Sequence, residues 1–123
     1  MQPALMMLIL TSVAMSAIAQ LLLKMGVGAV RADGAGVGAS AGIAFLQSPW
    51  VMAGFGLYGL GAILWLYVLA RLPLSAAYPF VGLGFILTMA LGVLALGESL
   101  SPIRIAGTLL IALGCVCVSR SIA

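Results

Sequence analysis

The fold of this chain is decided by an unbroken apolar stretch at residues 50–70, WVMAGFGLYGLGAILWLYVLA. A helix needs roughly 17–25 residues to cross the hydrocarbon core of a bilayer, so this stretch is long enough to span it. Ser48 and Pro49 precede the stretch, and they are typical of a helix N-cap and of the first helical position. The stretch therefore predicts a transmembrane helix.

Three further apolar stretches have a similar length, and they run from Ala4 to Leu23, from Leu74 to about Leu96 and from Pro102 to about Ser119. We expect residues 1–123 to form a single all-α membrane domain, a bundle of four transmembrane helices at about 4–23, 50–70, 74–96 and 102–119. Residues 1–3 include no Lys or Arg, which is unlike a signal peptide, so we expect the first helix to remain uncleaved.

The composition supports this assignment. Hydrophobic residues make up 65% of the chain and charged residues only 6%, with a mean hydropathy of +1.35. Soluble domains carry about 25% charged residues, so this chain has too little polar surface for water and requires lipid as its solvent. The net charge of +3 comes from cations spread along the chain. Without a basic stripe, nucleic-acid binding is not expected.

Metal-binding and catalytic patterns are absent from the sequence. There is no histidine, and Cys115 and Cys117 lie two residues apart inside an apolar run. Side chains at that spacing point to different sides of a helix, so we interpret both thiols as small apolar fillers. We expect no metal ion, no cofactor and no enzymatic activity.

The most informative polar residues lie on the first helix, where Ser12, Ser16, Gln20 and Lys24 recur every four residues. This spacing drifts by only about 40° per step, so the four form one polar stripe about 18 Å long. Such a stripe faces either a cavity or the neighbouring helices, which serine and glutamine can join by hydrogen bonds. We favour the cavity because the stripe ends in a cation.

The third helix contains Tyr78 and Pro79, followed by Gly82 and Gly84. Proline removes one backbone hydrogen bond of the helix, so we expect a kink at Pro79, with the two glycines permitting a bend or close packing. The predicted hinge consists of Pro79, Gly82 and Gly84. On the second helix, Trp65 and Tyr67 fit interfacial anchors better than ligand contacts.

Charged residues gather near one predicted membrane boundary, where Lys24, Arg104 and Glu98 lie. The two cations could hold a phosphate while the glutamate pairs with one of them. Ordinary snorkelling at an interface explains the same positions equally well. The only aspartate, Asp33, falls in the long connection 26–47, which is either a flexible loop or an interfacial segment.

These residues resemble the four-helix members of the drug/metabolite transporter superfamily, and in particular the subunits that flip undecaprenyl phosphate-linked aminoarabinose. The similarity rests on Ala19-Gln20 before Lys24, on the run from Leu72 to Pro79, and on Glu98 before the fourth helix. It spans most of the chain outside the first connection. The resemblance implies a dimeric transporter of a lipid-linked sugar in a bacterial inner membrane.

The chain is also similar to the small multidrug resistance exporters. Gly107 and Gly114 share one face of the fourth helix, and with Leu110 and Ile111 they look like the dimerisation seam of those exporters. However, Ser16 stands where those exporters carry a membrane glutamate. Drug–proton exchange therefore lacks its central carboxylate.

We therefore expect a flippase-like subunit that forms a homodimer or pairs with a similar four-helix subunit. The predicted substrate-binding residues are Ser12, Ser16, Gln20, Lys24, Tyr78, Glu98 and Arg104. Lys24 and Arg104 would hold the phosphate, while Tyr78 would contact or gate the sugar. The alternatives are a small multidrug resistance-type cation exporter and a non-transporting accessory subunit.

Overall fold

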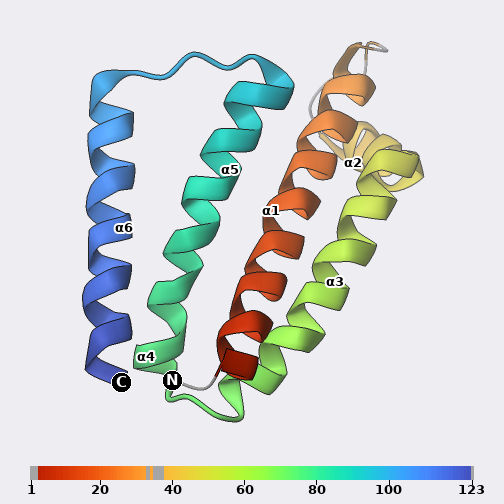
Figure 1. Ribbon diagram of the computed structural model, residues 1–123. Coiled ribbons are helices and arrows are strands. Elements are labelled where there is room, and N and C mark those ends of the chain that lie inside the picture. Colours follow the sequence, from red (N-terminus) through yellow and green to blue (C-terminus); the bar gives the residue numbers. More distant parts are fainter. Residues whose placement is uncertain (1–2, 33, 35–37, 123) are drawn as a thin grey trace.

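The computed structural model describes residues 3–32, 34 and 38–122, and these residues are mainly helical (Figure 1). Asp33 lies outside the described residues. The elements in chain order are α1 (Pro3–Ala32), α2 (Ala39–Gln47), α3 (Pro49–Leu69), α4 (Leu74–Ala77), the 3-10 turn η1 (Tyr78–Phe80), α5 (Val81–Leu96) and α6 (Pro102–Ile122).

Four segments are long and apolar enough to cross a membrane, namely α1, α3, the continuous run from α4 to α5, and α6. These spans are 30, 21, 23 and 20 residues long in the described chain, and the last of them runs from Pro102 to Ser121 of α6. The expected all-α, four-span architecture is confirmed. The chain is a multi-pass membrane protein.

The first helix is longer than the sequence suggested, because α1 continues past Leu23 to Ala32. Gly26 is buried, and a side chain built on it would lie 2.5 Å from Val51 Cγ2 of α3. This close contact extends the α1–α3 packing beyond the apolar run, to residues whose local sequence reads as a loop. At 1.5 Å per residue, α1 is about 45 Å long.

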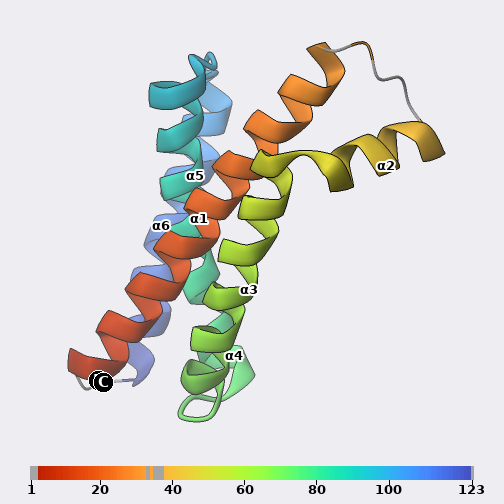
Figure 2. The ribbon, with the colours of Figure 1, turned by 90° about the vertical axis from the view of Figure 1, so that its right-hand side faces the viewer.

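The segment left undecided between residues 26 and 47 also contains α2. Figure 2 shows that α2 runs across the direction of α1 and α3 instead of alongside them. It ends at Gln47, and Ser48, with an extended backbone, separates it from Pro49, the first residue of α3. Proline suits this first helical position because it has no amide hydrogen to leave unpaired.

In space the spans follow the order α6, α5, α1, α3 (Figure 1). The most extensive contacts are those of α1 with α3, followed by those of α1 with α5. The buried share of the most apolar window falls from 33% in α1 to 6% in α6. Because lipid is itself apolar, the exposed side chains of α6 need no cover from the rest of the chain.

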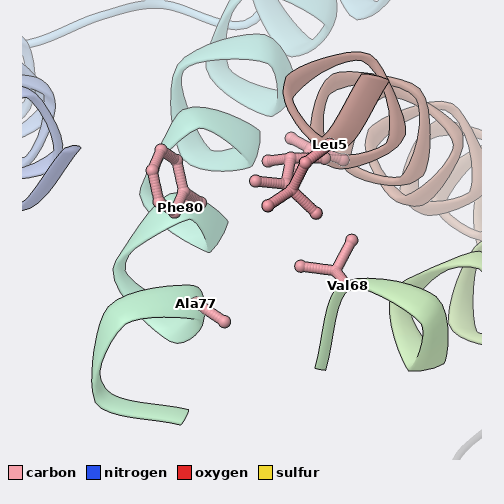
Figure 3. Packing of buried hydrophobic residues seen from close by; sticks show 6 residues of the cluster. Leu5, Val68, Ala77 and Phe80 are labelled. Atoms are coloured by element: carbon pink, nitrogen blue, oxygen red, sulfur yellow. The ribbon is translucent and has the colours of Figure 1, made fainter. Parts of the chain in front are cut away.

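A cluster of buried apolar side chains joins three of the spans. Leu5, Ile9 and Val13 of α1 meet Val68 of α3 and the pair Ala77 and Phe80 of α4 and η1. Figure 3 shows Val68, Ala77 and Phe80 around Leu5. This packing holds η1 against α1 and thereby positions Tyr78, the first residue of η1.

Candidate functional site

A cavity of about 250 Å³ lies between α1, α3, η1 and α5. Its lining combines serine hydroxyls, aromatic rings and small residues: Ser12, Val13, Ser16, Tyr58, Gly61, Ala62, Trp65, Tyr78, Val81 and Gly84. Ser12, Ser16, Tyr78 and Gly84 come from the residues singled out in the sequence. The structure therefore brings part of the predicted site together.

Ser12 both joins helices and lines the cavity. Its side chain is only 4% exposed, and its Oγ donates a hydrogen bond of 2.8 Å to the carbonyl of Gly61. This is the helix-joining role that a serine can play in a membrane. A Cβ built on Gly61 would make ordinary van der Waals contact with the Ser12 carbonyl oxygen, at 3.5 Å, so α1 and α3 are in contact at this point.

The rest of the polar stripe becomes more exposed along α1. Ser16 is partly buried in the cavity wall, whereas Gln20 and Lys24 are exposed. Lys24 lies eight residues beyond Ser16, or about 12 Å along the helix axis. The stripe thus leads from the cavity between the helices to the outer surface of α1, and its four residues do not form one compact cluster.

Aromatic side chains form much of the cavity wall. Tyr58 and Trp65 come from α3, and Tyr78, 61% exposed, comes from η1. The sequence favoured interfacial anchoring for Trp65, which here lines the cavity and packs against the buried cluster. Tyr58 was missed. Its signal was the spacing 58, 61, 62, 65, which places all four residues on one face of a helix.

The third span is irregular at the predicted hinge, where η1 separates α4 from α5. The Cys115 thiol of α6 donates a hydrogen bond of 2.8 Å to the carbonyl of Pro79. Gly82 is packed closely, because a Cβ there would lie 2.6 Å from Ile111 Cγ2 and 2.7 Å from Cys115 Sγ. The fourth span therefore docks at the break. Whether the break moves stays a prediction.

Glu98 lies in the connection between α5 and α6, and Arg104 lies in the first turn of α6. Gly97 ends α5 with a φ of 67°, and the Glu98 amide donates to the Gly92 carbonyl at 3.1 Å. Arg104 Nη1 donates to the Ser99 carbonyl at 3.2 Å.

Within the described residues, no ion pair joins Glu98 to Arg104 or to Lys24. Figure 1 shows α5 between α1, which carries Lys24, and α6, which carries Arg104. No contact among the described residues therefore brings Lys24 and Arg104 together into one phosphate site.

Comparison with known proteins assigns the family. The chain is 35% identical over 85 residues to a protein of Pseudomonas aeruginosa named probable 4-amino-4-deoxy-L-arabinose-phosphoundecaprenol flippase subunit ArnE, a match that covers 69% of this chain and 74% of that relative. This chain belongs to the ArnE family. The resemblance drawn from Gln20, Lys24, Tyr78-Pro79 and Glu98 is thereby confirmed.

Two other ArnE relatives with the same printed name match shorter regions. The Pseudomonas savastanoi protein is 36% identical over 72 residues, covering 58% of this chain and 63% of the relative. The Aeromonas hydrophila protein is 46% identical over 44 residues, covering 36% of this chain and 39% of the relative. These two matches thus span less than two thirds of each relative. No protein-family model and no solved structure matches the chain.

On α6 the sequence predicted a dimer seam of Gly107, Leu110, Ile111 and Gly114. Side chains built on Gly107 and Gly114 would meet nothing within 4 Å, and Leu110 is 69% exposed. Ile111 differs, because it packs against Gly82 inside the same chain. The open face of this ArnE-family chain therefore consists of Gly107, Leu110 and Gly114.

Proposed function

We propose that this chain is one subunit of a flippase that moves a lipid-phosphate-linked sugar across the inner membrane of a bacterium. The observation that carries the proposal is the polar stripe of α1, which runs from the cavity at Ser12 to the exposed Lys24. Membership of the ArnE family supports it, since the relatives are named as flippase subunits for 4-amino-4-deoxy-L-arabinose-phosphoundecaprenol.

The chemistry of the stripe matches the problem that such a lipid presents. Its phosphate and sugar lose hydration on entering the membrane, which costs free energy unless protein groups replace the water. In this mechanism hydroxyl, amide and ammonium groups along α1 replace that water one after another, while the polyprenyl tail stays in lipid. Lys24 holds the phosphate at the exposed end of the stripe, because a charge-assisted hydrogen bond suits an anion.

A second subunit completes the pathway in this proposal. Gln20 is exposed on the membrane-spanning part of α1, and a polar side chain at that depth is expensive unless it faces protein or a water-filled cavity. A homodimer or a heterodimer with a similar four-helix chain would cover it. The open face at Gly107, Leu110 and Gly114 gives such a partner a surface for close helix packing.

The test is to replace Lys24 with methionine, which keeps the apolar stem and removes the ammonium. A charge-assisted contact contributes about 1.5–3 kcal/mol, so affinity for the lipid should fall about 10- to 150-fold. Lys24→Arg should retain much of the affinity, since guanidinium also binds phosphate. Binding and flipping are measured in proteoliposomes, with a monodispersity check on each variant.

Arg120→Met serves as the control, because it removes a cation from the last turn of α6, at the other end of the bundle from the α5–α6 connection (Figure 1). It should leave lipid binding unchanged. If Lys24→Met bound and moved the lipid as well as the parent, the phosphate role would be wrong. Export of an organic cation in place of lipid would favour the multidrug-type exporter. Lipid binding without lipid movement would favour an accessory subunit.

A further inference from the structure

The cavity has a lining without any charged side chain among the described residues. Its polar groups are the hydroxyls of Ser12, Ser16, Tyr58 and Tyr78 and the indole N–H of Trp65. A volume of about 250 Å³ is slightly below the usual range of ligand pockets, about 300–1,000 Å³. It has room for one small ring but not for a polyprenyl chain.

The two serines offer complementary hydrogen bonds. Ser12 donates its hydrogen to the Gly61 carbonyl, so the Ser12 oxygen is left to accept a hydrogen bond from a ligand. Ser16 Oγ makes no hydrogen bond within the part of the chain that the structure describes, and it can donate or accept. The two lie one helical turn apart, about 6 Å along the axis, a spacing that suits different hydroxyls of one ring.

The aromatic residues supply flat apolar surface beside these hydroxyls. Tyr58 and Trp65 lie two turns apart on the same face of α3, and Tyr78 adds a third ring from η1. A sugar ring has apolar C–H faces and a polar hydroxyl edge. Aromatic faces beside hydrogen-bonding groups are therefore complementary to both parts of such a ring.

A positively charged ring fits this cavity less well. Aromatic rings attract a cation by about 0.5–2 kcal/mol, whereas desolvating an ion in a protein interior costs several kcal/mol unless a counter-charge is present. Among the residues that the structure describes, no carboxylate lines the cavity, and Glu98 lies in the α5–α6 connection. The balance favours an uncharged ring.

We propose that this cavity binds the sugar ring of the lipid-linked substrate in an uncharged form, through Tyr58, Trp65, Tyr78 and the hydroxyls of Ser12 and Ser16. The proposal rests on the proposed function and deepens it. It separates two stations about 12 Å apart along α1: a phosphate station at Lys24 and a sugar station at the cavity. A charged substituent on the sugar ring then weakens the affinity of the cavity for that ring.

The chain offers an internal reporter for the sugar station, because it has two tryptophans and only Trp65 lines the cavity. In Trp50→Phe, all tryptophan fluorescence comes from Trp65. The probes are undecaprenyl phosphate, undecaprenyl phosphate-arabinose and its 4-amino-4-deoxy analogue, each in nanodiscs. We expect both sugar lipids to change the emission of Trp65 and bare undecaprenyl phosphate to leave it unchanged. In Trp65→Phe, which reports from Trp50 alone, the difference in emission between the sugar lipids and bare undecaprenyl phosphate should disappear, because Trp50 packs beside Gly26, near the phosphate site at Lys24.

Ser16→Ala tests the hydroxyl contact separately. The loss of one hydrogen bond, about 0.5–1.5 kcal/mol, should weaken both sugar lipids about 2- to 10-fold and leave undecaprenyl phosphate unaffected. The matched control is Ser119→Ala on α6, where the hydroxyl bonds to the Val116 carbonyl of its own helix. That variant should bind all three lipids like the parent.

The charge preference is measured at pH 6, where the sugar amine is protonated. The arabinose lipid should bind at least as tightly as the amino analogue. A tenfold preference for the amino analogue at this pH would overturn the inference, and so would an equal Trp65 response to bare undecaprenyl phosphate. If none of the three lipids bound to the parent protein, the proposed function itself would fail, which is a different result.

Discussion

At the scale of single residues, Gly82 controls how closely α6 can pack on α5. A Cβ at this position would lie 2.6 Å from Ile111 Cγ2 and 2.7 Å from Cys115 Sγ. Cys115 is buried and hydrogen-bonded to the Pro79 carbonyl, while Ile111 is partly exposed beside it. Even a methyl group must therefore push α6 away or force its side chains out of their preferred rotamers.

We expect Gly82→Ala to lower the free energy of unfolding by about 1–3 kcal/mol, as overpacking does in other tight cores. The measurement is thermal unfolding in detergent. Gly56→Ala is the matched control, because its Cβ would meet nothing within 4 Å. That change should be neutral or stabilising by up to about 1 kcal/mol, as alanine is the better helix former. Equal destabilisation of both variants would contradict the close α5–α6 contact.

At the scale of elements, we attribute the short 3-10 turn η1 to one residue, Pro79, which can be substituted. Pro79 has no amide hydrogen, so the Ser75 carbonyl lacks its usual helical partner and the third span cannot continue as a regular helix through this point. The irregular turn is also where Tyr78 joins the cavity wall. The backbone break and the position of an aromatic side chain are thus coupled.

In Pro79→Ala the restored amide should make the span more regular and withdraw Tyr78 from the cavity. Lipid movement should then slow by about fivefold or more, equivalent to about 1 kcal/mol in the barrier, while helicity stays equal or rises. Pro102→Ala at the first position of α6, where no helical hydrogen bond is missing, should transport normally. The comparison uses flipping in proteoliposomes and circular dichroism. A normal rate in Pro79→Ala would remove the break from the mechanism.

Most of the elements could be predicted because each depends on local sequence. Apolar length defined the spans, and proline located η1. The extension of α1 to Ala32 could not be predicted, since it accompanies contacts between Gly26 and Val51, which are distant in the sequence. The orientation of α2 depends on contacts with both α1 and α3, and the local pattern does not encode these.

The candidate site was predictable along one helix and not between helices. The spacing of Ser12 and Ser16 on α1 was sufficient to place them on one face, and both line the cavity. The relation of Lys24 to Arg104 depends on the order of the helices in space, with α5 between α1 and α6 (Figure 1). A sequence pattern gives the ends of helices but not that order.

At the scale of the whole molecule, the open face of α6 is where we predict that a partner packs. Gly114 has no neighbour within 4 Å of a built Cβ, so a larger side chain is accommodated within the single chain. Gly114→Leu should therefore leave the fold intact and weaken assembly about 5- to 150-fold, equivalent to about 1–3 kcal/mol, by blocking close approach of a partner helix.

The dimer fraction is followed by native mass spectrometry and crosslinking. Val116→Leu is the control, because it enlarges an exposed side chain about 200° around α6 from Gly114. It should assemble like the parent. Unchanged dimer fractions in Gly114→Leu would move the seam to another helix, with the exposed Gln20 side of α1 as the next surface to test.

The unequal lengths of the spans give the molecule different tolerances to bilayer thickness. The hydrocarbon core of a bilayer is about 30 Å thick, which the 20-residue span Pro102–Ser121 of α6 matches almost without excess. The 30 residues of α1 extend well beyond it. In a thicker membrane α1 can enter further while it remains helical, with the long side chains of Lys24 and Arg31 reaching back to the interface, whereas α6 has almost no residues to spare. Hydrophobic mismatch, at fractions of a kcal/mol per Å, would therefore act first on α6, the helix that carries the open face.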